Sequence, residues 1–245
     1  SDEEVKQFDK KGYLIIENAF DSKFMKKIAS LIDPFEAKVT EVLRGFEDGK
    51  VFISRAEEIT FSTHLVTLSE ELKKFSKHEV FSSLCLDLVG KNVRLYWDQA
   101  VYKKPGTQEE FPWHQDNGYT FIEPQAYLTC WLALTDTNET NGCPWVIPEI
   151  HRLGTLKHET TDLGFEISLS DRDAIPLPLE AGSIAVFSSL TPHRTGPNTS
   201  QEIRKTYILQ YAPDGAQRKI SGSLSEPVDD GLRQYYVVKN GLILS

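Results

Sequence analysis

A histidine and a carboxylate two residues apart, together with a second histidine far along the chain, form the strongest candidate metal-binding set in this sequence. His114 and Asp116 lie in the segment FPWHQD, and His193 lies in the segment TPHRT. In an extended chain, side chains two residues apart point to the same side, about 6.6 Å apart, and can reach one ion. Two imidazoles and one carboxylate on one side of a metal leave open positions, as in non-haem Fe(II) oxygenases. We therefore expect His114, Asp116 and His193 to be catalytic metal ligands.

Arg204 is a candidate for anchoring an anion beside this metal. It follows His193 by eleven residues, and the turn-forming sequence GPNTS lies between them. If the stretch folds as an antiparallel hairpin, the two residues face each other with Cβ atoms about 5 Å apart. A guanidinium forms paired hydrogen bonds with a carboxylate. The spacing therefore predicts that Arg204 holds the far carboxylate of a keto acid whose near end chelates the metal.

In these motifs and in their order, the sequence resembles the phytanoyl-CoA dioxygenase family of Fe(II)/2-oxoglutarate-dependent oxygenases. The resemblance extends over most of the chain, except around residues 45–65 and 155–175, where we find none. It rests on the segments Phe8-x-x-x-Gly12-Tyr13-Leu14, Trp113-His114-Gln115-Asp116, NGCPWVIPxxH from Asn141 to His151, Thr191-Pro192-His193-x-Thr195 with Arg204, and Asn240-Gly241.

The resemblance implies Fe(II) as the metal, with 2-oxoglutarate and O2 as cosubstrates. It assigns the iron to His114, Asp116 and His193, the distal carboxylate of 2-oxoglutarate to Arg204 assisted by Thr195, and the cosubstrate pocket to Gln99 and Trp131. Their position next to the iron ligands places Trp113, Asn117 and Tyr119 near the primary substrate. The implied reaction oxidises an unactivated C–H bond of a small or mid-sized metabolite, by hydroxylation as the default outcome, and releases succinate and CO2.

Two other classes of function remain open. A zinc-dependent hydrolase could use the same three ligands with a bound water, although it would have no use for Arg204. A non-catalytic jelly-roll binding protein would need none of them.

The adjacent Lys103 and Lys104 could bind the phosphates of a coenzyme A thioester, but we interpret them as a solvated strand end. The substrate itself is not indicated; we expect its pocket to be built by residues 1–90, 106–111 and 153–173.

The elements that must position these residues are strands with helices packed on them. Turn signals, capping residues and apolar periodicity predict helices at 2–10, from Asp21, at 69–76 and at 78–88, strands at 13–16, 93–102, 126–134, 182–188 and 203–211, and a hairpin at 235–244. We expect a mainly β fold with packed helices and a double-stranded β-helix (jelly-roll, cupin-like) core. We read residues 1–245 as one domain, in which 1–90 form a mostly helical support and 91–245 form the core.

The composition excludes several kinds of partner. The 27 basic and 36 acidic residues give a net charge of −9, which repels a phosphate backbone and argues against nucleic acid. No apolar run has membrane-spanning length, so we expect no membrane partner and a cytoplasmic location. The cysteines at 85, 130 and 143 lack metal-site spacing and are expected to be reduced and structural. The histidines at 64, 78, 151 and 158 are also expected to be structural. The expected partner is a small-molecule substrate, and oligomeric state is not indicated.

Overall fold

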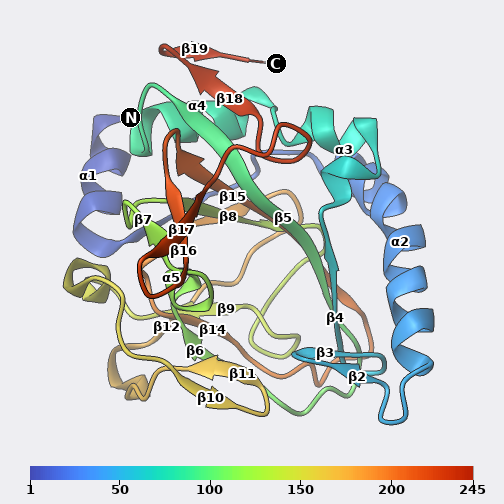
Figure 1. Ribbon diagram of the computed structural model, residues 1–245. Helices are drawn as coiled ribbons and strands as arrows, with labels where there is room; N and C mark the ends of the chain where they lie inside the picture. The colour runs from blue at the N-terminus through green and yellow to red at the C-terminus, as the bar shows by residue number, and fades with distance from the viewer. Residues whose placement is uncertain (245) are drawn as a thin grey trace.

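Two antiparallel β-sheets form the body of the protein in the computed structural model, which describes residues 1–244 (Figure 1). The larger sheet has the strand order β1-β13-β8-β15-β5-β4-β3-β2, and β18 and β19 extend it beside β5. The smaller sheet has the order β12-β9-β14-β6. Many neighbouring strands come from distant parts of the chain, such as β1 beside β13 and β8 beside β15, so the sheets bring residues that are far apart in sequence toward one interior.

The strands of the larger sheet are β1 (Tyr13–Ile16), β2 (Lys50–Val51), β3 (Ser54–Arg55), β4 (Ile59–Thr63), β5 (Val93–Lys103), β8 (Leu128–Ala133), β13 (Ile184–Ser188), β15 (Arg204–Pro213), β18 (Tyr236–Lys239) and β19 (Leu242–Ile243). Those of the smaller sheet are β6 (Phe111–His114), β9 (Pro144–Val146), β12 (Ile175–Pro176) and β14 (His193–Thr195). Two small sheets lie outside these: β10 (Glu159–Thr161) with β11 (Gly164–Glu166), and β7 (Ile122–Glu123) with β16 (Gln217–Ser221) and β17 (Leu224–Pro227).

The helices are α1 (Asp2–Lys11), α2 (Ser22–Arg44), α3 (Glu70–Phe75), α4 (Glu79–Leu88) and the short α5 (Asp116–Tyr119), with 3-10 turns at Leu65–Thr67, Ile150–Leu153 and Asp171–Asp173. The α2 helix begins where the Asp21 carboxylate accepts a hydrogen bond from the Phe24 amide, 2.8 Å away, as the sequence predicted. It continues through Pro34 to Arg44. The predicted helices near 69–76 and 78–88 correspond to α3 and α4.

The central strands carry two different faces. On β15, Tyr207, Leu209 and Tyr211 are fully buried in the main hydrophobic core, to which α2, α3 and α4 also contribute side chains. Because side chains alternate along a strand, Arg204 and Ile208 point to the opposite face and line a cavity. The face covered by helices therefore supplies most of the buried apolar surface, at about 1.5–3 kcal/mol for each fully buried large side chain. The other face is free to carry chemistry.

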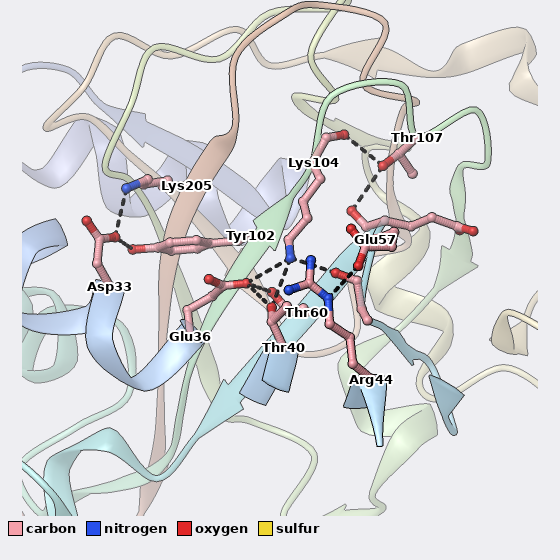
Figure 2. Close-up of polar contacts among 12 residues, drawn as sticks. Asp33, Glu36, Thr40, Arg44, Glu57, Thr60, Tyr102, Lys104, Thr107 and Lys205 are labelled. Carbon is pink, nitrogen blue, oxygen red and sulfur yellow. Dashed lines mark hydrogen bonds and ion pairs between the residues drawn. The ribbon is translucent and has the colours of Figure 1, made fainter. Parts of the chain in front are cut away.

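Polar contacts hold α2 against the larger sheet (Figure 2). Asp33 accepts hydrogen bonds from the Lys205 ammonium and the Tyr102 hydroxyl, both at 2.7 Å. One to two turns further along the helix, Lys104 lies 3.4 Å from Glu36 and donates to Thr40 at 2.9 Å. Lys104 is thus engaged in fixing the helix, and the prediction that it forms a solvated strand end was wrong.

The sequence missed the strands between residues 50 and 63. The β2 and β3 strands form a hairpin of two residues each, and β4 pairs with β5 along five register positions, from Ile59 with Lys103 to Thr63 with Gln99. Strands β1 and β4 join the larger sheet, so residues 91–245 do not build that sheet alone. The division of the chain into a helical support and a core remains a prediction.

The C-terminal hairpin predicted from Asn240-Gly241 is confirmed. Strands β18 and β19 pair across these two residues, which have φ angles of 53° and 78°. Such angles are required at both central positions of a tight type I′ turn. The cysteines at 85, 130 and 143 are buried and free, as predicted. No helix among residues 1–244 has the length and apolarity to cross a membrane.

Candidate metal centre and cosubstrate site

Three donor groups converge at one end of the interior cavity. The Nε2 atoms of His114 and His193 lie 3.9 Å and 3.7 Å from the same oxygen, Oδ1 of Asp116. One potential ligand atom from each residue lies within 4.8 Å of the other two. Ligand atoms about 2.0–2.2 Å from a metal are themselves slightly more than 3 Å apart. The three groups can therefore hold one ion after a small inward movement.

Backbone carbonyls orient both imidazole rings. His114 Nδ1 lies 2.8 Å from the Pro112 carbonyl, and His193 Nδ1 lies 3.0 Å from the Thr191 carbonyl. Because a carbonyl oxygen only accepts, each Nδ1 carries the proton and each Nε2 presents a lone pair to the centre. Burial, and then the proximity of His193, lower the pKa of His114 well below its usual value. A neutral imidazole is the form that binds a metal.

Asp116 reaches this centre by a route that the sequence did not predict. His114 is the last residue of β6, whereas Asp116 is the first residue of the short helix α5, so the two do not share one extended strand. The turn into the helix brings the carboxylate back toward the rings. Its second oxygen, Oδ2, accepts a hydrogen bond of 2.5 Å from the Thr129 hydroxyl. This bond leaves Oδ1 to face the histidines.

Sequence reasoning missed Thr129. It lies on β8 two residues before Trp131, and both line the cavity. A signal was available, because residues two apart on a predicted strand face the same side. The Thr129 hydroxyl also accepts a hydrogen bond of 3.2 Å from the Gln210 amide, which helps to fix its direction.

Arg204 is a buried cation whose positive charge is balanced by no carboxylate among residues 1–244. Its side chain is 1% exposed, and its one hydrogen bond runs from Nη1 to the Gly142 carbonyl at 3.0 Å. Its Nε atom has no partner, and among residues 1–244 no carboxylate forms an ion pair with it. The Trp131 ring lies 5.4 Å from the guanidinium carbon. Burial lowers the pKa of Arg204 to about 10, so the group stays charged and suits an anionic ligand such as a carboxylate.

The predicted hairpin between His193 and Arg204 was wrong. His193 lies on β14 and is paired with His114 and Val146 in the smaller sheet, whereas Arg204 on β15 is paired with Lys103 in the larger sheet. The GPNTS segment crosses from one sheet to the other. The two side chains nevertheless line the same cavity, because they enter it from opposite sheets.

The cavity has a volume of about 440 Å³ and receives most of the predicted site residues. Its lining includes the three candidate metal ligands and Arg204, together with Thr195, Gln99, Trp131 and Tyr119. Two predicted substrate residues do not reach it. Trp113 points away from the cavity because it precedes His114 on a strand, and its indole nitrogen donates to Asp171 at 2.6 Å. The amide of Asn117 donates to Thr155 at 2.7 Å.

The remaining histidines have structural contacts. His158 Nε2 accepts a hydrogen bond of 3.0 Å from the Gln115 amide, which helps to fix the backbone between two candidate ligands. His151 Nε2 lies 3.2 Å from the Asp9 carbonyl. The side chain of His78 accepts a hydrogen bond from Val80 at the start of α4. The ring of His64 lies edge-on to that of Trp97, with centroids 4.2 Å apart.

Comparisons with known proteins identify a family for this chain. Residues 8–206 match the family model described as phytanoyl-CoA dioxygenase. Phytanoyl-CoA dioxygenase 1 of Oryza sativa is 27% identical over 85% of this chain and 88% of its own length. The methylphosphonate hydroxylase of Gimesia maris is 34% identical, over 51% of this chain and 47% of that protein.

Solved structures show the same fold. The non-haem alpha-ketoglutarate-dependent carbocyclase SnoK from nogalamycin biosynthesis superposes with a TM-score of 0.73 at 21% identity, over 100% of this chain and 93% of that chain. EvdO2 of Micromonospora carbonacea, complexed with 2-oxoglutarate, gives 0.67 at 18% identity, over 93% of this chain and 94% of that chain. The predicted jelly-roll, cupin-like core is therefore confirmed. Because the family model covers most of the sequence, the protein belongs to the phytanoyl-CoA dioxygenase family and is an Fe(II)- and 2-oxoglutarate-dependent dioxygenase.

Proposed function

We propose that this dioxygenase oxidises an unactivated C–H bond of a small or mid-sized metabolite, with hydroxylation as the default outcome. The balanced reaction consumes the substrate, 2-oxoglutarate and O2 and yields the hydroxylated product, succinate and CO2. One observation carries the proposal: a cluster of two buried imidazoles and a partly buried carboxylate shares a cavity with a buried guanidinium that lacks a carboxylate partner. A cation of that kind suits a second carboxylate at a fixed distance from a metal.

His114, Asp116 and His193 would hold the iron through Nε2, Oδ1 and Nε2. The bound iron supplies the redox chemistry with O2 and the keto acid, which protein side chains cannot perform alone. The backbone carbonyls behind both rings hold the neutral tautomer that donates to the metal. Thr129 holds the carboxylate in one orientation. These contacts preorganise the ligands, which lowers the cost of assembling the site.

Arg204 would bind the distal carboxylate of 2-oxoglutarate, and Thr195 would place its hydroxyl nearby. Trp131 covers the guanidinium, and burial keeps water from competing for the ion pair. Gln99 also lines this region, and its Oε1 accepts a hydrogen bond of 3.2 Å from the Trp97 indole. The amide nitrogen of Gln99 is therefore the part of its side chain that can donate to a ligand.

The test is whether succinate formation requires iron, 2-oxoglutarate and O2 together. We expect the purified protein to form succinate slowly without a primary substrate, and faster when a substrate is added. A zinc-dependent hydrolase would be active with zinc and would form no succinate. A non-catalytic binding protein would form none with either metal. Absence of succinate with fully iron-loaded protein would contradict the proposed function.

We also propose a cytoplasmic location and no nucleic-acid partner. Three buried, free cysteines are compatible with a reducing compartment, and the net charge of −9 opposes binding to phosphate backbones. Fractionation of the producing cells would test the location.

A further inference from the structure

The cavity offers no free charge to a primary substrate. Its lining contains four side chains that are acidic, basic or imidazole: His114, Asp116, His193 and Arg204. If the proposed function is right, iron occupies the first three and 2-oxoglutarate occupies the fourth. Every other lining residue that the structure describes is apolar, aromatic or uncharged. A charged group on the substrate would therefore enter this cavity without a counter-ion.

One wall of the cavity is a continuous row of aromatic rings that ends at the metal donors. At the mouth, Phe52 meets Phe165 edge-on with centroids 6.1 Å apart, and Phe165 lies 5.0 Å from Tyr119. Tyr119 is stacked 6.2 Å from Phe111, and Phe111 meets the His114 ring edge-on at 4.9 Å. A bound molecule would contact ring faces and edges from the mouth to the iron. Such contacts favour apolar and aromatic groups.

The wall on the larger sheet has the same character. Tyr96 and Tyr127 pack with centroids 5.2 Å apart, and Trp97 lies beside them on β5. The Trp97 indole N–H is already donated to Gln99. The remaining polar groups of the lining are uncharged hydroxyls and amides, set among apolar and aromatic side chains. The cavity can orient a molecule but cannot neutralise one.

Basic side chains near the cavity have partners elsewhere. Arg55, on the hairpin at the mouth, lies 3.2 Å from a Glu109 carboxylate oxygen and donates to the Asp162 carbonyl at 3.2 Å. Lys103, beside Arg204, donates to the carbonyls of Gly196 and Glu109 at 2.5 Å and 3.1 Å. Neither forms part of the cavity lining. Their charges are used to hold loops together.

The volume of the cavity limits the size of the primary substrate. About 440 Å³ lies in the lower half of the range of small-molecule sites, about 300–1,000 Å³, and 2-oxoglutarate must share it. We propose, on the basis of the proposed function, that the primary substrate is an uncharged and predominantly apolar molecule, bound against the aromatic wall from Phe52 to Phe111. A phosphonate or a zwitterion is then excluded by the unpaired charge that it would bring into the cavity, and the coenzyme A part of a thioester would have to lie outside it.

The test compares three probes that share one phenylacetyl group: methyl phenylacetate, phenylacetate and phenylacetyl-CoA. Their binding is measured by calorimetry on protein loaded with Fe(II) and 2-oxoglutarate under anaerobic conditions. We expect the neutral ester to bind at least tenfold more tightly than the carboxylate, and the thioester to bind no more tightly than the ester. Equal or tighter binding of the carboxylate would overturn the proposal, and so would tighter binding of the thioester or an ester that fails to bind.

A positive charge placed in the aromatic wall should reverse the preference of the cavity for the neutral ester over the carboxylate. Phe165 is half-buried at the mouth, where an arginine side chain has room to reach solvent. In Phe165→Arg we expect phenylacetate to gain at least tenfold in affinity while the ester loses. Phe46→Arg is the matched control, because Phe46 is 49% exposed and outside the cavity lining. A preference that stays unchanged in Phe165→Arg would place the probes elsewhere and contradict the proposal.

This test can be separated from that of the proposed function. Calorimetry reports binding and needs no turnover, whereas the proposed function is judged by succinate formed with iron, 2-oxoglutarate and O2 and without any probe. Succinate formation combined with preferred binding of the carboxylate would overturn only the substrate class. Preferred binding of the ester without succinate formation would overturn only the proposed function.

Discussion

The inner end of the cavity and its mouth are built in different ways. At the inner end, His114 and His193 are 6% exposed and Arg204 is 1% exposed, and all three lie on strands of the two main sheets. At the mouth, Val51 and Phe52 are 45% and 57% exposed on a hairpin whose strands have two residues each. The inner end is held by the pairing of strands within the two main sheets and by buried hydrogen bonds, whereas the mouth is held by a few contacts between hairpins.

This difference places the residues for iron and 2-oxoglutarate in one region of the cavity and the proposed substrate contacts at the mouth in another. Groups that act on iron and 2-oxoglutarate must be placed within fractions of an ångström, so they lie where packing permits one arrangement. The outer part of the proposed substrate wall, Phe52 and Phe165, lies on short hairpins, where a changed side chain disturbs little else. The comparison therefore predicts that substitutions lose their effect on 2-oxoglutarate chemistry as they move from the inner end to the mouth.

The largest effect is expected for Asp116→Ala. Loss of the carboxylate removes one metal ligand and should reduce iron-dependent succinate formation by at least about a thousandfold. Metal content, measured after dialysis, should fall with it. Asp162→Ala is the matched control, because Arg55 binds the Asp162 backbone carbonyl, which alanine retains. Full activity and normal iron content in Asp116→Ala would refute the ligand assignment.

The next effect is expected for Arg204→Ala. Removing one member of a buried ion pair costs about 3–5 kcal/mol, which corresponds to a weakening of 2-oxoglutarate binding by roughly a hundredfold to several thousandfold. Iron content should stay unchanged. Lys103→Met provides the contrast, because Lys103 is equally buried but donates to two backbone carbonyls. We expect Lys103→Met to alter stability more than 2-oxoglutarate affinity, and equal losses of affinity in both variants would contradict the role of Arg204.

A smaller effect is expected for Thr129→Val. The valine has nearly the same shape but cannot donate to Asp116 Oδ2, so the carboxylate becomes free to rotate. Loss of such a supporting bond costs about 10–100-fold in metal affinity. Thr129→Ser keeps the hydroxyl and should restore most of the affinity. If serine is no better than valine in a metal titration, Thr129 acts through packing alone.

The pH dependence of stability tests whether burial lowers the pKa of Lys103, the second buried basic side chain. Burial, and then the charge of Arg204, lower the pKa of Lys103 to about 7, whereas the unfolded chain titrates near 10.4. Above pH 7 the unfolded state therefore binds the extra proton, and stability should rise with pH by up to about 1.4 kcal/mol per unit until the unfolded lysine titrates. Thermal unfolding between pH 7 and 9 should show this rise. The rise should disappear in Lys103→Met, and an unchanged slope there would assign it to other groups.

The inner end was largely predictable from the sequence, because residue chemistry and strand alternation both constrain it. His114, Asp116, His193 and Arg204 were identified from their types and spacing, and the structure brings them to one cavity. The course of the backbone between these residues was not predictable. The sequence could not show that a helix begins at Asp116 or that the segment after His193 crosses between sheets, since both depend on tertiary packing.

The mouth was largely unpredictable. Strands β2 and β3 are too short for periodicity to reveal, and their pairing is fixed by contacts with distant segments such as residues 162–165. The adjacent strand β4 was missed for a related reason, because its apolar residues alternate over only five positions. Trp113 and Asn117 were misplaced because closeness in sequence to a metal ligand does not fix the direction of a side chain. The local sequence therefore indicates only that the mouth is rich in aromatic residues, and not how its strands are arranged.

The smallest effect is expected at the mouth itself, for Phe52→Asn. Phe52 has a φ angle of 52°, in the left-handed region that costs a bulky residue about 1–2 kcal/mol and that asparagine tolerates better. The lost ring contact with Phe165 is worth about 0.5–1.5 kcal/mol, so the two changes nearly cancel and unfolding free energy should change by less than about 1 kcal/mol. Succinate formation without primary substrate should stay within about twofold, because Phe52 belongs to neither the iron site nor the Arg204 site. Binding of methyl phenylacetate should weaken severalfold. A large loss of 2-oxoglutarate turnover in this variant would show that the mouth also positions the inner end, and the distinction between the two regions would fail.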